Sequence, residues 1–165
     1  LILAGGKSTV GLESTVIDMT DEISVLLRPG SITPEVLEMH IGPVRIQIDT
    51  VDHAPRSPGQ LLRHYAPKTS LRLKAVDVKP GEALLAFGST RFMGIAGGGH
   101  AKDLPDGALL NLSETGDLTE AAANLFAMLH RLDTGQFSGI AVMDIPNTGL
   151  GLAINDRLNR ATTSK

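Results

Sequence analysis

Two short apolar segments constrain the fold of this chain more than any other feature. Ala83–Phe87 has no polar side chain, Gly139–Asp144 has one only at its last position, and turn residues bound both segments. A strand that is apolar on both faces is typical of a parallel sheet that is covered on both sides. Two further strands are predicted at residues 71–75 and 108–112, where short apolar stretches also lie between turn residues.

Helical periodicity follows the predicted strands at 108–112 and 139–144. A helix is predicted from Leu118 to about Asp133, with Thr119 helping to start it and Gly135 ending it. A last helix is predicted from Leu150 to about Ala161. Strands that alternate with helices predict an α/β fold, here a small Rossmann-like three-layer sandwich with a mainly parallel sheet. The apolar stripe of the first helix consists of Leu118, Ala122, Leu125, Leu129 and Leu132.

Residues 1–46 have a different pattern, with short β segments and tight turns. Strands are predicted at 14–19, 24–28 and 44–48, and a short helix is predicted from Pro34 with Thr33 as its N-cap. The chain opens on a strand-like Leu-Ile-Leu-Ala, so we expect it to be the C-terminal portion of a longer protein. These residues would then lack partner strands and would take contacts from the following domain or from another chain.

Residues 47–69 are predicted to form an extended linker. Pro55, Pro58 and Pro67 exclude a long regular helix, because proline fixes φ and biases the preceding residue toward extended backbone. Disordered tethers are usually rich in Gly, Ser and acidic residues, whereas this segment carries basic and aromatic side chains. It therefore reads as an ordered linker with functional side chains, and a proline-kinked tether is the alternative. The side chains concerned are Arg63, His64, Tyr65 and Lys68.

Ser14 and Arg28 are candidate ligand contacts upstream of the linker. A serine hydroxyl at a strand start can bind the carboxylate or amino group of a small ligand. An ordinary strand position is the alternative, and it suits Thr15 better than Ser14. Arg28 begins an Arg-Pro-Gly turn, where a fixed guanidinium can form bidentate hydrogen bonds to a phosphate or carboxylate. A solvated arginine at a turn is the alternative there.

Two glycine-containing turns and a polar helix segment complete the candidates. Ala96–His100 has neither the dinucleotide-binding nor the P-loop spacing, so a surface turn is expected. Pro146–Gly151 joins a strand to a helix at the strand's carboxyl end, where open α/β sheets bind ligands and helix amides receive anions. A ligand site and a structural turn both remain open there. Asn155–Arg157 are expected to form a polar helix face.

Composition excludes several classes of protein. The chain has no cysteine, which rules out disulfides and thiolate zinc and suits the cytoplasm. No His and carboxylate cluster has metal-ligand spacing, and no apolar run or signal peptide indicates a membrane or secreted protein. The net charge of -3 gives no general attraction to nucleic acid, so any RNA contact would need a local basic patch.

Four segments, taken in order, resemble the long, two-domain form of threonylcarbamoyl-AMP synthase, of the YrdC-like family. They are Gly11–Asp18, Val25–Thr33, Ser57–Pro67 and Asp144–Arg157. The resemblance covers nearly the whole chain and is least distinctive between about residues 71 and 138. It implies three parts. Residues 1–46 would be the C-terminal end of the catalytic domain, residues 47–69 a linker and active-site lid, and residues 70–165 a Rossmann-like accessory domain.

The resemblance also implies an activity and its site residues. The family enzyme condenses L-threonine, bicarbonate and ATP to threonylcarbamoyl-AMP and pyrophosphate, for the threonylcarbamoyladenosine modification of tRNA. Mg²⁺ is expected with ATP. A linker that closes over the acyl-adenylate would protect it from water. The implied roles are threonine binding by Ser14, ATP binding by Arg28, Tyr65 and His64, and candidate phosphate contacts by Arg63 and Lys68.

The family's Lys-x-Arg and Ser-x-Asn motifs do not occur before Gly11, which departs from the family pattern. The resemblance therefore places the catalytic residues upstream, and this chain alone is expected to be inactive. Two other classes stay open for residues 70–165. One is a module that binds tRNA or a partner protein, which a cluster of surface Lys and Arg would favour. The other is a structural or dimerisation domain, which predicts no ligand pocket at the carboxyl ends of the strands.

Overall fold

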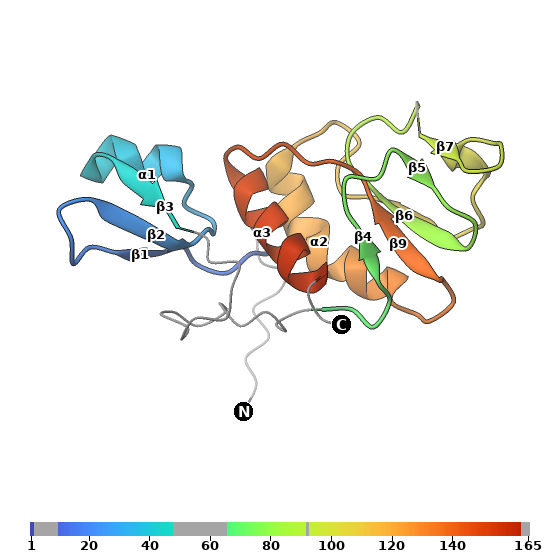
Figure 1. The fold of residues 1–165 in the computed structure, drawn as a ribbon, viewed down its shortest axis with the longest axis horizontal. Coiled ribbons are helices and arrows are strands. Elements are labelled where there is room, and N and C mark those ends of the chain that lie inside the picture. Colours follow the sequence, from blue (N-terminus) through green and yellow to red (C-terminus); the bar gives the residue numbers. More distant parts are fainter. Residues whose placement is uncertain (2–9, 48–65, 92, 163–165) are drawn as a thin grey trace.

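The computed structural model describes residues 1, 10–47, 66–91 and 93–162. The described residues form two units (Figure 1): a small one of residues 10–47, and a larger one of residues 66–162 that contains the main sheet. Arg63, His64 and Tyr65 of the predicted linker lie outside the described residues. None of the described helices is long and apolar enough to cross a membrane.

The larger unit is built on a four-stranded, all-parallel sheet. Its strand order is β4-β9-β6-β8, so β6 and β9 occupy the centre. Leu84 pairs with Ala141 of β9 on one side and with Leu109 of β8 on the other. The predicted parallel sheet and its two central apolar strands are therefore confirmed. The strands are β4 (Leu71–Arg72), β6 (Glu82–Ala86), β8 (Leu109–Asn111) and β9 (Gly139–Val142).

The two faces of this sheet are covered differently. Leu85, Ile140 and Val142 pack against α2 (Leu118–Leu132) and α3 (Leu150–Thr162), which form the layer on one face. Successive strand residues point to opposite faces. The alternate side chains, Leu84, Ala86 and Ala141, therefore form a second core with the other layer.

That other layer contains no long helix, which differs from the sheet flanked by helices that the sequence predicted. It is made of two short parallel strands, β5 (Asp77–Val78) and β7 (Gly94–Ile95), and a 3₁₀ turn (Ala101–Asp103). The connections that cross this face contain Pro80 and a run of three glycines, which favour turns over helix. Among the described connections between strands of the main sheet, that from β8 to β9 is the only one with an α-helix, α2.

The small unit has a three-stranded sheet in the order β1-β2-β3. The strand β1 (Val16–Asp18) pairs antiparallel with β2 (Ser24–Arg28), which pairs in parallel with β3 (Val44–Ile46). The helix α1 (Pro34–Ile41) connects β2 to β3 and begins, as predicted, with proline after Thr33. The Thr33 side chain makes no cap hydrogen bond.

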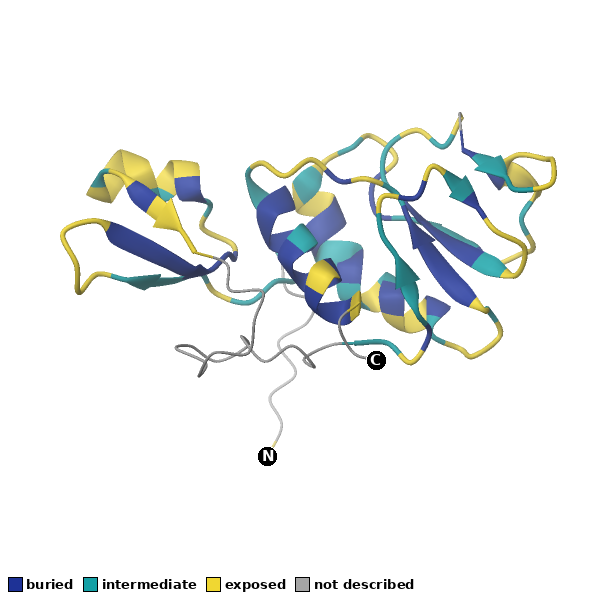
Figure 2. Ribbon diagram, viewed as in Figure 1, coloured by how far each residue is buried: buried dark blue, intermediate teal, exposed yellow. Residues whose placement is uncertain are grey.

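Helix α3 lies on the side of the larger unit that faces the small unit, and most of its residues are buried (Figure 2). Ile154 and Leu158 belong to the large core, whereas Leu152 packs with Leu26 of β2 and Val44 of β3. The chain at Gly11 also runs against α2, because a Cβ on this glycine would lie 2.9 Å from the carbonyl oxygen of Ala122. The expectation that residues 1–46 take contacts from the chain that follows them is confirmed for described residues between Gly11 and Val44.

The predicted extent of α2, from Leu118 to about Asp133, is confirmed, but one predicted strand end and the predicted helix-start residue were wrong. The first strand of the main sheet ends at Arg72 rather than at residue 75, and Lys74 just beyond it has a positive φ of 52° that cannot continue a strand. Helix α2 is started by Asp117, whose side chain accepts a hydrogen bond from the amide of Glu120, and not by Thr119. Gly135, with φ of 77°, follows the helix end as predicted.

Candidate functional site

Ser14 and Arg28 lie side by side where the chain enters β1 and leaves β2. The Arg28 guanidinium donates from Nε to the Ser14 carbonyl and from Nη2 to the Ser14 hydroxyl, both at 3.0 Å. Arg28 is 9% exposed, whereas Ser14 is exposed. A buried guanidinium thus orients an accessible hydroxyl, and the two predicted ligand contacts form one feature, called here the Ser14–Arg28 pair.

The backbone around this pair is closely packed. A Cβ on Gly30 would lie 2.3 Å from the Glu13 carbonyl oxygen and 2.4 Å from the Thr15 amide nitrogen, so only glycine fits. The Thr15 hydroxyl donates to the Ile32 carbonyl at 2.7 Å and accepts from the Ile32 amide at 3.0 Å. Thr15 therefore holds the two segments together, while the hydroxyl of Ser14 faces outward.

Arg157 of α3 fixes the same two segments from behind. Its Nε donates to Glu13 Oε2 at 2.8 Å and its Nη2 to the carbonyl of Pro29 at 3.0 Å. Asp156 accepts hydrogen bonds from Arg157 and, at 3.0 Å, from Arg160. The side chains of Asp156, Arg157 and Arg160 are each at most 4% exposed. The prediction that Asp156 and Arg157 form a polar helix face was wrong, because the small unit covers this side of α3.

The turn before α3 is also tied to the small unit. The amide of Gly149 donates to Glu35 Oε1 of α1 at 3.2 Å. Hydrogen bonds hold the pKa of Glu35 below its ordinary value of 4.5. The largest effect comes from the Thr33 side chain, and the backbone amides of Glu35 and Gly149 add to it. A Cβ on Gly151 would lie 1.8 Å from the Pro146 carbonyl oxygen. This end of the turn has a structural role, and its anion is a carboxylate of the same chain.

Lys68, at the end of the predicted linker, lies against the C-terminal end of α2. Its amide donates to Asp133 Oδ2 at 3.0 Å, and the amide and hydroxyl of Thr69 donate to Oδ1 at 2.8 Å. Burial of Asp133 opposes ionisation, but these hydrogen bonds outweigh it and lower the pKa of the carboxyl. Asp133 therefore anchors the chain as it enters the main sheet, and the Lys68 side chain is exposed.

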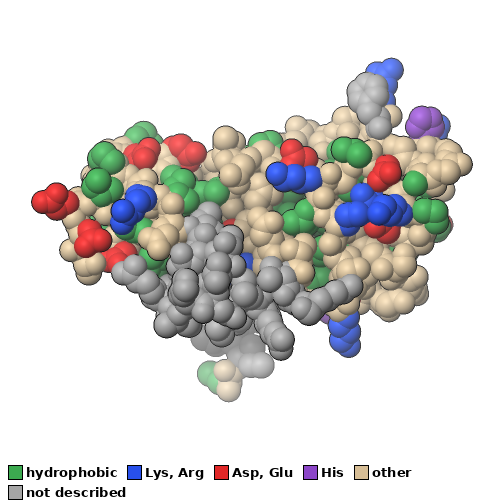
Figure 3. Space-filling view, in the orientation of Figure 1, with side chains coloured by type: hydrophobic (Ala, Val, Ile, Leu, Met, Phe, Trp, Pro, Cys, Tyr) green, Lys and Arg blue, Asp and Glu red, His purple; other side chains and the backbone are tan. Residues whose placement is uncertain are grey.

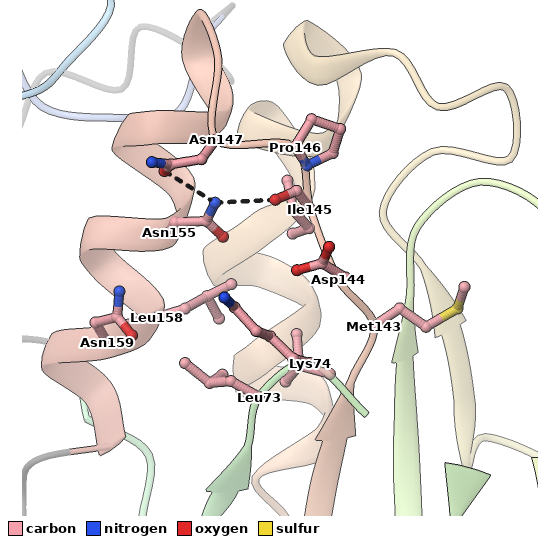
Figure 4. Close-up of a pocket in the computed structure, with 11 residues that line it drawn as sticks. Leu73, Lys74, Met143, Asp144, Ile145, Pro146, Asn147, Asn155, Leu158 and Asn159 are labelled. Atoms are coloured by element: carbon pink, nitrogen blue, oxygen red, sulfur yellow. Dashed lines mark hydrogen bonds between the residues drawn. The ribbon is translucent and has the colours of Figure 1, made fainter. Parts of the chain in front are cut away.

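A cavity of about 280 Å³ lies at the carboxyl ends of β4 and β9, beside α3 (Figure 4). Its lining combines apolar side chains such as Leu158 and Ile145 with five polar side chains. The latter are Lys74, Asp144, Asn147, Asn155 and Asn159. Within the described ranges, no group of three or more His, Asp or Glu side chains could hold a metal ion. This edge of the sheet is therefore a second candidate site, with a partly polar lining.

Comparison with known proteins decides the family. The sequence profile of the family described as "Threonylcarbamoyl-AMP synthase, C-terminal domain" matches residues 32–163. The chain belongs to this family. The matched residues contain α1, the main sheet, α2 and α3, so the family assignment rests on the larger unit and on part of the small one.

Curated relatives and solved structures agree with the threonylcarbamoyl-AMP synthase assignment. The chain is 32% identical over 165 residues to a threonylcarbamoyl-AMP synthase of Bacillus subtilis and 34% identical over 171 residues to that of Pyrococcus abyssi. These alignments cover 97% and 98% of this chain but 48% of each relative. The chain thus spans about half the length of the curated relatives it matches.

Two solved structures share the fold. One is the crystal structure of P. abyssi Sua5 complexed with L-threonine, with a TM-score of 0.72 and 30% identity over 96% of this chain and 48% of that chain. The other is a variant of P. abyssi Sua5 in which an adjacent histidine and tyrosine are alanine, with a TM-score of 0.70 and 29% identity over 96% of this chain and 47% of that chain.

Within this threonylcarbamoyl-AMP synthase domain, the structure brings Ser14 and Arg28 together and places Lys68 at the end of α2. The sequence analysis missed Arg157 and Glu35, which join the two units. The sequence does contain one signal for the ion pairs beside Arg157. Asp156 and Arg160 are four residues apart, a spacing that pairs side chains on one helix face.

Proposed function

We propose that this chain is part of a threonylcarbamoyl-AMP synthase, which converts L-threonine, bicarbonate and ATP to threonylcarbamoyl-AMP, pyrophosphate and water. The product would serve threonylcarbamoyladenosine formation in tRNA, in the cytoplasm. The observation that carries the proposal is the Ser14–Arg28 pair, a buried guanidinium holding an exposed hydroxyl in a fold shared with a protein crystallised with L-threonine. The division into residues 1–46, 47–69 and 70–165, with a Rossmann-like last domain, belongs to the same proposal.

Each residue of the proposed site has a role that suits its chemistry. The Ser14 hydroxyl would hydrogen-bond L-threonine, and Arg28 would hold Ser14 in place while its charge faces the ATP phosphates. His64 and Tyr65 would contact the nucleotide from the linker, with Arg63 and Lys68 near the phosphates. One fact supports the linker roles. His64–Tyr65 contains the single tyrosine of the sequence, and the P. abyssi variant replaces an adjacent histidine and tyrosine.

The described residues do not fit a protein-held Mg²⁺ site. Mg²⁺ prefers carboxylate oxygens and water, but Glu13, the carboxylate next to Ser14, is engaged by Arg157. We therefore assign no residue of this chain to Mg²⁺. A magnesium ion that accompanies ATP would be held by the phosphates and by groups other than those described.

Two observations bear on the alternative classes, a tRNA-binding module and a purely structural domain. A module that binds tRNA should present a basic cluster. On the face in view, Figure 3 shows scattered Lys and Arg side chains and one basic patch on the larger unit, with acidic side chains beside it. A purely structural domain predicted no pocket at the carboxyl ends of the strands, yet a cavity lies there.

The proposal is tested by ATP-dependent pyrophosphate release with L-threonine and bicarbonate. The assay compares this 165-residue chain with a form extended upstream to the relatives' length. We expect turnover in the extended form and none in this chain, because the implied catalytic motifs lie upstream of Gly11. Turnover by this chain alone would contradict the assignment of catalysis upstream, and an inactive extended form would contradict the proposed function.

A further inference from the structure

The cavity at the carboxyl edge of the main sheet has no role in the proposed synthase activity. It lies beyond the ends of two neighbouring parallel strands, β4 and β9, with α3 as its third wall. Ligands of open α/β sheets bind at this edge, because polar residues that follow adjacent strands converge there. Lys74 follows β4 and Asp144 follows β9, so the two strands bring opposite charges to one cavity.

The two charged groups are available to a ligand. Both side chains line the cavity and both residues are exposed. Among the residues that the structure describes, neither Lys74 nor Asp144 has a side-chain hydrogen bond or ion pair. In Figure 4 the Lys74 amino group and the Asp144 carboxylate point toward the same space beside α3. The cavity thus offers one cation and one anion that are not neutralised by a direct contact with each other.

Asn155 supplies an acceptor of fixed orientation. Its Nδ2 donates to the Ile145 carbonyl at 3.0 Å and to Asn147 Oδ1 at 3.3 Å. These two bonds determine which end of the amide is nitrogen. Oδ1 is consequently turned toward the space that Lys74 and Asp144 also face (Figure 4). An acceptor beside a carboxylate suits a ligand group with several N–H donors.

The backbone at Lys74 adds an observation that does not depend on the side chains. Its φ of 52° is the only positive φ at a non-glycine residue in the described part of the chain. Glycine or asparagine adopts this conformation more easily than lysine, and such strained residues cluster at ligand sites. Lys74 lines the cavity, and its side chain extends from the end of β4 toward α3 (Figure 4).

We propose that this cavity binds a small zwitterion of the α-amino acid class. The ligand carboxylate would pair with the Lys74 ammonium, and the ligand ammonium would pair with Asp144 and with Asn155 Oδ1. The volume of about 280 Å³ lies just below the usual range of ligand pockets, which begins at about 300 Å³, so it suits a metabolite smaller than a nucleotide. The apolar wall at Leu158 and Ile145 would accept a short side chain.

The test is an NMR titration of the ¹⁵N-labelled 165-residue chain with L-alanine and L-threonine. We expect saturable shifts of the Lys74, Asp144 and Asn155 signals with a dissociation constant of about 1 mM or below. Propionate lacks the ammonium and ethylamine lacks the carboxylate, so each should bind at least about tenfold more weakly than L-alanine. Sodium phosphate and AMP serve as the probes for a simple anion site and for a nucleotide site.

Two substitutions connect the binding to the named groups. Lys74→Gly removes the ammonium and relaxes the backbone, so it should keep the fold and weaken L-alanine binding at least about tenfold. Asp144→Asn should do the same. The matched controls, Lys102→Ala and Asp106→Asn, change exposed residues outside the cavity and should bind normally. Ser14→Ala should leave the L-alanine-dependent shifts of the Lys74, Asp144 and Asn155 signals unchanged, which separates this site from the proposed threonine contact.

Several outcomes would overturn the proposal. Absence of shifts with either amino acid, or equal binding by Lys74→Gly, would show that the cavity is not an amino acid site. Phosphate that binds as tightly as L-alanine would make it an anion site, and tighter binding of AMP would make it a nucleotide site. Loss of binding in Ser14→Ala alone would assign the signal to the proposed synthase site.

Discussion

Arg157 donates a hydrogen bond to Glu13, a residue 144 positions earlier in the chain, at 2.8 Å. The same guanidinium donates to the carbonyl of Pro29. Glu13 precedes Ser14, and Pro29 follows Arg28. One buried side chain of α3 therefore sets the distance between the two segments that carry the Ser14–Arg28 pair. The last helix of the larger unit is in this way part of the structure that supports the proposed site.

Replacing Arg157 should destabilise the whole chain. Arg157→Met leaves Glu13 without this partner and leaves buried Asp156 with Arg160 alone. We expect the free energy of unfolding to fall by about 3 kcal/mol, because removing one member of a buried ion-pair network leaves the remaining charges with less compensation in a low-polarity environment. Urea denaturation measures the change.

The control for Arg157 is Arg131→Met, at an exposed position in the last turn of α2. Its effect should stay below about 0.5 kcal/mol. Equal effects of the two substitutions would show that the buried network contributes no more than a surface arginine.

Gly30→Ala should separate the two crossing segments. The new Cβ would lie 2.3 Å from the Glu13 carbonyl oxygen, so the backbone must move. We expect a loss of stability of more than about 2 kcal/mol and altered NMR signals at Ser14 and Arg28. Gly94→Ala is the matched control, because its nearest atom is 3.9 Å away and its φ is not positive. A Gly30→Ala protein as stable as Gly94→Ala would contradict the close approach.

The contact between Glu35 and Gly149 should depend on pH. The pKa of Glu35 is lowered in the folded state, so its stabilising effect is complete above the unfolded value of about 4.5 and is lost as the pH falls through the folded value. The stability difference between the parent chain and Glu35→Gln should therefore narrow below about pH 4.5. Chemical denaturation of both proteins from neutral to acidic pH measures it. A difference that is constant over this range would contradict the proposed titration.

Asp117 should contribute more to α2 than Thr119. Asp117→Ala removes the side chain that accepts a hydrogen bond from the Glu120 amide, so the free energy of unfolding should fall by about 1 kcal/mol. Thr119→Ala, inside the first turn and exposed, should change stability by less than about 0.5 kcal/mol. Thermal denaturation of the two variants compares them directly, and a larger effect at Thr119 would restore the start that the sequence predicted.

The main sheet was predictable because its two central strands are short apolar segments bounded by turn residues. Ala83–Phe87 and Gly139–Asp144 are apolar on both faces, and this pattern has few other solutions. The strands β5 and β7 were not predicted, because a two-residue strand carries no periodicity. Their presence explains why helices cover only one face of the sheet. The length of β4 was overestimated because φ at Lys74 is a local property that the sequence pattern does not show.

The candidate site was predictable only through resemblance. No periodicity distinguishes Ser14 from another strand residue or Arg28 from another turn arginine. Arg157 and Glu35 could not be placed from sequence, because charged residues on a helix usually face solvent. The burial of Arg157 and the contact of the exposed Glu35 with Gly149 both depend on the packing of the small unit against the larger one. Tertiary contact between distant segments, rather than local pattern, determines this part of the structure.

The most direct test of the central claim is the kinetics of pyrophosphate release as a function of L-threonine concentration, in the form extended upstream. Ser14→Ala should raise the KM for L-threonine by at least about tenfold, with a smaller change in the KM for ATP. Thr15→Ser, which keeps the hydroxyl that binds Ile32, is the control and should be close to the parent. An unchanged KM for L-threonine in a folded Ser14→Ala protein would contradict the assignment of the Ser14–Arg28 pair to the threonine site.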